Sequence, residues 1–156
     1  MTNGPGLGSD VAGGDEVIKA ELTLSFLNRD IEMFRRNMAT VREKDYASLY
    51  DDAAMTFGLQ CGFLPLDEFP AWIEVVREFL PGSQHYFKIV YRAIDKENYD
   101  HALAMAEATA RYFPDNELLV REARFVREII PGLKERKRLR DLLGMREPEE
   151  VVLPAA

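Results

Sequence analysis

The sequence predicts an all-α protein. Apolar residues recur with helical spacing through most of the 156 residues, whereas the alternation typical of a half-buried strand is scarce. Prolines, glycines and capping residues divide this pattern into segments of about 12 to 15 residues with short turns between them. Short turns force consecutive helices to pack antiparallel, so we expect stacked helical hairpins in one domain over residues 15–144.

Both ends of the chain are predicted to be flexible tails. Five of the ten glycines lie in residues 1–14, and ordering such a segment costs much backbone entropy. Residues 145–156 form the second predicted tail. The first tail lacks the basic and apolar regions of a signal peptide, and no apolar run reaches the roughly 20 residues that a membrane span needs. We therefore expect a soluble, cytoplasmic protein with no membrane span.

Charge and cysteine content argue against several classes of protein. The net charge of −7 disfavours nucleic-acid binding, because counterion release at phosphates needs clustered lysine and arginine. Cys61 is the only cysteine, so the chain has no internal disulfide framework and fits a reducing compartment. A chain of this length that is 47% hydrophobic can bury a core without metal ions or disulfides.

A long N-terminal helix is predicted over residues 15–43. Its apolar residues are spaced alternately by three and four positions, the heptad pattern of helices that stay in register. They are Val17, Ala20, Leu24, Leu27, Ile31, Phe34, Met38 and Val41. The helix either packs on its own domain or forms a seam between two chains. In the second interpretation the protein is a homodimer, and its self-association residues are Leu24, Leu27, Ile31, Phe34 and Met38.

Shorter helices are predicted along the rest of the chain. The candidate N-caps are Asp67, Ser83 and Asn98. The prolines expected to follow helix ends are Pro81, Pro114 and Pro131. The predicted helices cover 46–62, 67–79, 84–96, 98–113, 117–130 and 133–144.

A period of 33 residues relates two of these segments. Shifted by 33 positions, residues 69–81 superpose on 102–114, and each segment ends in a proline. The superposed pairs are Phe69 with Ala102, Ile73 with Ala106 and Val76 with Thr109. The motif Y-x-x-A-L at 99–103, followed by a helix and by P-D-N at 114–116, resembles the second helix of a tetratricopeptide repeat. In that family small residues let the two helices of a hairpin approach closely, and a proline ends the unit.

The resemblance to tetratricopeptide repeat proteins covers 83–116, extends to 50–82 and continues into a third unit made of helices 117–130 and 133–143. The sequence departs from the family pattern where Tyr86, Ile89 and Val90 replace Trp, Leu and Gly, and where Phe69 replaces Ala. The resemblance implies a short solenoid of stacked hairpins with a long N-terminal helix. The first helices of such repeats line a groove that holds a segment of another protein.

The resemblance also implies which residues face this groove. The partner-binding residues are Gln84, Phe87, Tyr91, Ile94, Asp95, Leu118, Arg121 and Phe125, with Asp51, Ala54 and Gly58 in the preceding unit. Phe87 and Tyr91 lie one helical turn apart, so they are either an anchor for an apolar side chain of the partner or part of the core.

No catalytic or metal-binding constellation is predicted. His85 and His101 lie sixteen residues apart, and neither has a second ligand at i+3 or i+4. Cys61 has no lysine or histidine near it in the sequence that would lower the pKa of its thiol. Phosphate-binding loops and nucleophile motifs do not occur. We therefore expect a protein that is not an enzyme and that holds neither cofactor nor metal.

A basic segment at residues 134–140 has five basic residues and one acidic residue in an otherwise acidic chain. It is either a basic face for an acidic protein segment or an anionic surface, or a solvated helix face that balances neighbouring acids. From the repeat pattern, the predicted function is that of an adaptor or chaperone that binds another protein. The alternative is a structural or regulatory subunit that oligomerises through its N-terminal helix.

Overall fold

All regular secondary structure in residues 6–144 is helical in the computed structural model, which describes side chains for residues 14–144. The all-α prediction is therefore confirmed for this range. The helices are α1 (Gly6–Leu27), α2 (Ile31–Lys44), α3 (Ala47–Gln60), the 3-10 turn η1 (Cys61–Phe63), α4 (Phe69–Phe79), α5 (Gln84–Asp95), α6 (Tyr99–Tyr112) and α7 (Glu117–Leu142). Helix α1 begins inside the segment predicted as a tail. The second predicted tail, 145–156, lies outside the described residues.

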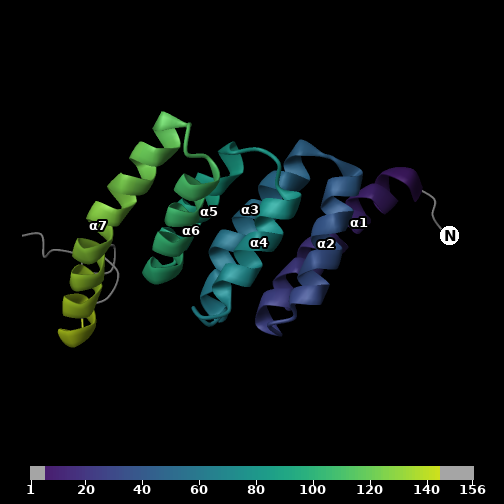
Figure 1. Cartoon of the computed structure of the whole chain (residues 1–156). Helices are drawn as coiled ribbons and strands as arrows, with labels where there is room; N and C mark the ends of the chain where they lie inside the picture. The colour runs from purple at the N-terminus through teal and green to yellow at the C-terminus, as the bar shows by residue number, and fades with distance from the viewer. Residues whose placement is uncertain (1–5, 145–156) are drawn as a thin grey trace, which may run out of the picture.

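The helices follow one another in a row from the N-terminal end to the C-terminal end (Figure 1). Helices α1, α3 and α5 contact one another in sequence, as do α2, α4 and α6, so the first six helices form two layers. Helix α7 packs along α6 and closes the C-terminal end of the row. Each helix thus packs mainly against helices that are one or two places away from it in the chain order.

Aromatic rings fill the core between the two layers at the N-terminal half of the row. The ring of Phe34 lies 4.9 Å from that of Trp72 and 5.1 Å from that of Phe26, measured between centroids. Phe57 stacks on Phe34 at 5.6 Å and on Phe69 at 5.6 Å. These five rings come from α1, α2, α3 and α4, and all are buried. Large buried rings dominate the energetics of a core, so this cluster holds the first two hairpins together.

The prediction of one N-terminal helix over 15–43 is wrong, because the chain turns between α1 and α2. Arg29 adopts a left-handed backbone conformation with φ 51°, which ends α1. Asp30 then caps α2, and its carboxylate accepts a hydrogen bond from the Met33 amide at 3.1 Å. The turn lets Phe26 and Phe34 meet inside a hairpin, so the seam positions before and after the turn no longer lie on one continuous face.

The predicted break at Pro131 is also absent, since α7 runs through Pro131 as a single helix. A proline inside a helix removes one hydrogen bond and clashes with the preceding turn. Contacts beyond the proline offset this cost. Leu133 is half-buried against the core, and Lys134 bonds to Asp100 at 2.8 Å. Farther along, Arg140 bonds to Glu97 in the turn before α6. The third predicted repeat unit is therefore one long helix and not a hairpin.

Of the three predicted caps, one is misplaced and two make no capping hydrogen bond. Helix α4 starts after Glu68 and not after Asp67, and Pro70 lies in its first turn as expected. Ser83 and Asn98 occupy N-cap positions, yet neither side chain accepts a capping hydrogen bond. The Asn98 amide is engaged elsewhere, at the end of α3.

Candidate functional site

The residues predicted to bind a partner divide between the surface and the core. Leu118 and Phe125 on α7 are 60% and 51% exposed, and Tyr91 on α5 is 37% exposed. Phe87 is buried, and Ile94 is half-buried against the core. Gln84, Asp95 and Arg121 are exposed.

Tyr91 joins the two helices that carry this surface. Its hydroxyl donates a hydrogen bond to the Glu122 carboxylate of α7, and its ring lies 5.9 Å from the ring of Phe87. Burial, followed by the hydrogen bond to Glu122, raises the pKa of the Tyr91 phenol to about 12, so it stays protonated and remains a donor at neutral pH. The aromatic pair is therefore divided, with Phe87 in the core and Tyr91 at the surface.

Polar links tie together the helices on one side of the molecule, which we call the inner face. They are Lys19 with Asp52 between α1 and α3, Lys88 with Asp51 between α3 and α5, and Tyr91 with Glu122 between α5 and α7. Leu118 and Phe125 lie one helical turn to either side of Glu122, so they share this face. The inner face thus combines exposed apolar side chains with a scaffold of polar contacts.

Helix α3 presents different residues to the inner face from those predicted. Asp51 lies there, but Ala54 and Gly58 are buried. A Cβ atom on Gly58 would lie 2.6 Å from the Ile89 carbonyl oxygen and 2.6 Å from the Cβ of Arg92, so α3 and α5 meet closely at this point. Met55 is exposed, although it was not among the predicted residues. The small residues of α3 mark its contact with α5, and Met55, the neighbour of Ala54, lies outside that contact.

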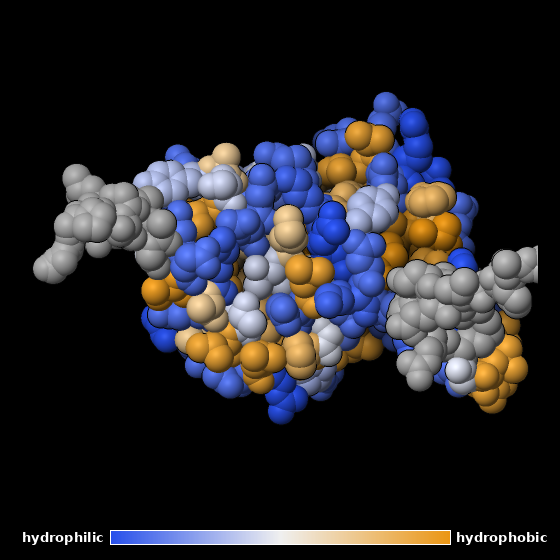
Figure 2. All heavy atoms as spheres, turned by 180° about the vertical axis from the view of Figure 1, so that it is seen from behind, coloured by the Kyte–Doolittle hydropathy of each residue, from blue (hydrophilic) through white to orange (hydrophobic). Residues whose placement is uncertain are grey.

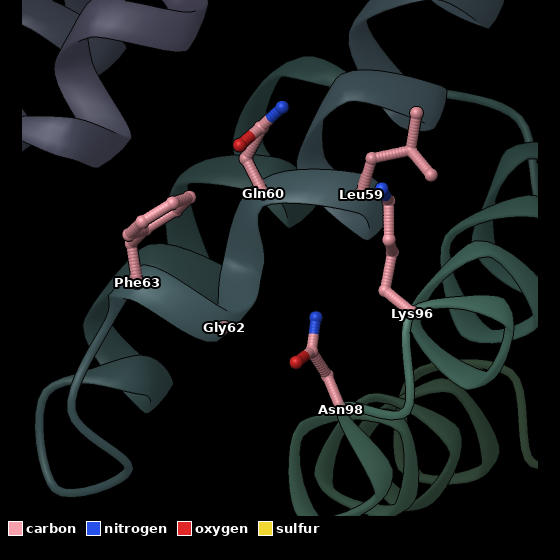
Figure 3. A pocket seen from close by; sticks show the side chains of 6 residues that line it. All are labelled: Leu59, Gln60, Gly62, Phe63, Lys96 and Asn98. Carbon is pink, nitrogen blue, oxygen red and sulfur yellow. The ribbon is translucent and has the colours of Figure 1, made fainter. Parts of the chain in front are cut away.

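A hollow of about 430 Å³ lies where the end of α3 meets the turn between α5 and α6. It is lined by Leu59, Gln60, Gly62, Phe63, Lys96 and Asn98. The side chains of Lys96 and Asn98 extend from that turn toward the end of α3 (Figure 3). The Asn98 amide packs directly on Gly62, because a Cβ atom there would lie 2.4 Å from its oxygen. The residues that line the hollow are mixed in polarity.

The described residues include no group poised for catalysis at this hollow. Cys61 adjoins it in sequence, but its thiol is buried and donates to the Gly58 carbonyl at 3.4 Å. Burial raises the pKa of this thiol to about 12, so the nucleophilic thiolate is not formed at neutral pH. His101 contacts the Leu64 carbonyl at 2.7 Å through Nε2. Within residues 14–144 no three His, Cys, Asp or Glu side chains are grouped so that they could hold a metal ion.

His85 lies buried between α3 and α5. Its Nδ1 atom is 3.3 Å from Asp51 Oδ1 but makes no hydrogen bond to another described residue. Asp51 also accepts a hydrogen bond from Lys88, and the ring of Tyr50 lies 5.8 Å from that of His85. Burial lowers the pKa of His85 below its ordinary value of 6.5, and the attraction of Asp51 offsets this only in part.

We expect acid to destabilise the fold through His85. The folded protein binds a proton there less readily than the unfolded chain, so the free energy of unfolding is unaffected above about pH 6.5 and falls as the pH drops below it. The hydrogen bond from Lys88 lowers the pKa of Asp51 below 3.8, so the contribution of this carboxylate is lost only in stronger acid. Urea titrations at about pH 7.5 and 5.5 measure the effect. The loss of unfolding free energy between the two pH values should be smaller in His85→Gln than in His101→Gln. Equal losses in the two variants would contradict the assignment to His85.

The basic segment 134–140 is largely neutralised by neighbouring carboxylates. Lys134 bonds to Asp100, Lys137 to Asp141, Arg138 to Glu135 and Arg140 to Glu97. This pattern favours the second interpretation, in which the segment is a solvated helix face that balances nearby acids. The pairs with Asp100 and Glu97 also fasten the C-terminal half of α7 to the start of α6 and to the turn before it.

The residues predicted for self-association no longer form one stripe. Phe34 and Met38 are buried in the core, and Ile31 is partly buried against it. Leu24 and Leu27 remain exposed on α1. The seam is therefore divided between the inside of the first hairpin and its surface.

On the side shown in Figure 2 hydrophilic residues prevail, and apolar ones gather along the lower edge and toward the right-hand end. None of the helices within residues 6–144 is long and apolar enough to cross a membrane. Comparisons of the chain with family models, with curated proteins and with solved structures give no match.

Proposed function

We propose that this chain is a non-catalytic adaptor or chaperone that binds an apolar segment of another protein on the inner face, between α5 and α7. The observation that carries the proposal is the exposure of Leu118 and Phe125 beside Tyr91, on two helices held together by the bond from Tyr91 to Glu122. Exposed aromatic and aliphatic side chains on a rigid frame are typical anchors for a partner.

The spacing of 33 residues between equivalent positions of α4 and α6 supports a tetratricopeptide-like arrangement within this proposal. Residues 33 positions apart in α4 and α6 have the same environment, because both members of each pair are buried: Phe69 and Ala102, Ile73 and Ala106, Val76 and Thr109. In this arrangement α1, α3, α5 and α7 are the first helices of successive units, and the sides of these helices that carry the polar links form the inner face. A partner segment would then cross several units and contact side chains from more than one helix.

Site-specific crosslinking tests the proposal. We expect a photoreactive p-benzoylphenylalanine at position 125 to crosslink a discrete protein in cells that contain the natural partner. The matched probe at position 142 replaces a leucine that is 70% exposed near the end of α7, and it should not crosslink that protein. Leu118→Glu should abolish the crosslink at 125 while the far-UV circular dichroism stays unchanged. Identical crosslinks at 125 and 142, or none at 125 in the folded protein, would contradict the proposed face.

A further inference from the structure

The free side of α1 carries an apolar stripe. Val17, Leu24 and Leu27 are 55%, 45% and 47% exposed, and Ala20 between them is exposed as well. The opposite side of the helix buries Ile18, Leu22 and Phe26 against α2 and α3. Because α1 stands at the N-terminal end of the row, no helix among the described residues covers this stripe (Figure 1).

The helix at the other end of the row has a different free side. On α7 the exposed positions away from α6 carry the charged residues Glu117, Arg121, Arg124 and Glu128. Copies stacked head to tail would press the apolar stripe of α1 against these charges, which would then lose water without gaining partners. Contact between two α1 stripes instead buries apolar surface on both sides and closes after two copies.

The distribution of charge along α1 favours an antiparallel contact. Glu16 lies at the start of the stripe, and Arg29 lies just beyond its end. The Arg29 side chain makes no ion pair with another described residue, whereas Glu16 pairs only with Lys19 on its own helix, at 3.1 Å. In an antiparallel pair Arg29 of one copy comes beside Glu16 of the other, twice. Val17 then lies opposite Leu27, and Ala20 opposite Leu24, where its small side chain allows close approach.

We infer that a second copy of this chain docks on the free side of α1, forming an antiparallel two-fold dimer through Val17, Ala20, Leu24 and Leu27. One helix stripe per copy offers far less than the roughly 800 Å² per partner of a standard interface, so the dimer is weak, with a dissociation constant in the micromolar range. This surface is separate from the one proposed for the partner between α5 and α7, and neither proposal depends on the other.

Sedimentation equilibrium of the full chain between about 5 and 200 µM tests the dimer. Leu24→Glu should raise the dissociation constant at least about tenfold, because it places a charge at the centre of the stripe. Leu142→Glu is the matched control, since it makes the same change at an exposed leucine on α7 and should leave the dissociation constant unchanged. Circular dichroism of both variants checks the fold.

A charge reversal adds a test that does not depend on the apolar stripe. Arg29→Glu alone and Glu16→Lys alone should each weaken the dimer several-fold, and the double variant E16K/R29E should recover the affinity of the original chain. A chain that is monomeric at every concentration would overturn the inference. So would a dimer that Leu24→Glu leaves intact, or a double reversal that fails to restore the dimer lost in the single variants.

Discussion

Replacing Phe34 with alanine is expected to lower the free energy of unfolding by about 3 to 5 kcal/mol, the usual cost of removing a buried phenylalanine ring. Phe34 is buried and lies within 5.6 Å, centroid to centroid, of Phe26, Phe57 and Trp72. The cavity left behind would therefore open between the first two hairpins, in a region with few flexible neighbours to fill it. A small domain with a typical stability of about 5 to 15 kcal/mol would lose a large part of it.

Urea unfolding followed by the fluorescence of Trp72 measures this loss, because Trp72 is the only tryptophan and touches the altered site. Phe125→Ala is the matched control, since it makes the same substitution at a ring that is half exposed, and it should cost far less. The result also separates two roles for Phe34. Alanine in place of a residue of an interchain seam would dissociate the protein without unfolding it, whereas alanine in place of a core residue destabilises the monomer.

Replacing Gly58 with alanine should destabilise the protein, although alanine is the better helix former. An added Cβ would meet the Ile89 backbone carbonyl and the Cβ of Arg92, each at 2.6 Å, and neither atom belongs to the flexible end of a side chain. Helix α3 would have to move away from α5, and overpacking of this kind costs about 1 to 3 kcal/mol. Valine at the same position should cost more, because its two methyl groups reach farther into α5.

Gly132→Ala provides the opposite sign in the same protein. Gly132 lies within α7, and a Cβ atom there would have nothing within 4 Å. Alanine should therefore stabilise the fold by about 0.5 to 1 kcal/mol through helix propensity alone. Thermal and urea unfolding of both variants compare the two sites directly. A neutral or stabilising Gly58→Ala would mean that α3 and α5 are not in close contact.

Apolar periodicity was sufficient to predict the helical class and the positions of α3 to α6 within a few residues. The helix ends at 44–47, 79–84 and 95–99 coincide with changes in that periodicity or with Pro81 and Asn98. The 33-residue period also selected pairs of residues that are all buried. Short-range spacing suffices for such features because each depends on which side of one helix is apolar.

Two helix boundaries could not be predicted, for opposite reasons. At residues 28–30 the heptad spacing continued across a turn, and only Asp30 as a cap marked the break. At Pro131 a strong local breaker was overridden by tertiary contacts, since Leu133 and Lys134 hold the following turn against α6 and its preceding loop. At Pro131 the overriding contact joins Lys134 and Asp100, which are 34 positions apart in the sequence.

The candidate site was predicted in part. Tyr91, Leu118 and Phe125 are exposed, whereas Ala54 and Gly58, which were predicted to face the groove, are buried where α3 meets α5. A shift of one residue on α3 moves the outward position from Ala54 to Met55, because successive helical residues differ in direction by about 100°. Small residues such as Ala54 and Gly58 show where helices touch, and the outward-facing residues are therefore their neighbours. Sequence spacing alone does not fix that rotation.

Side-chain hydrogen bonds between different helices join positions only 31 to 43 residues apart in the described range. Among the residues whose side chains the structure describes, no hydrogen bond of this kind links α1 to α7. Opening can start as fraying at either end and travel inward one helix at a time, as in other linear arrays. A ligand that clamps α5 to α7 would protect the amide hydrogens of that end while leaving those of α1 to exchange at their own rate.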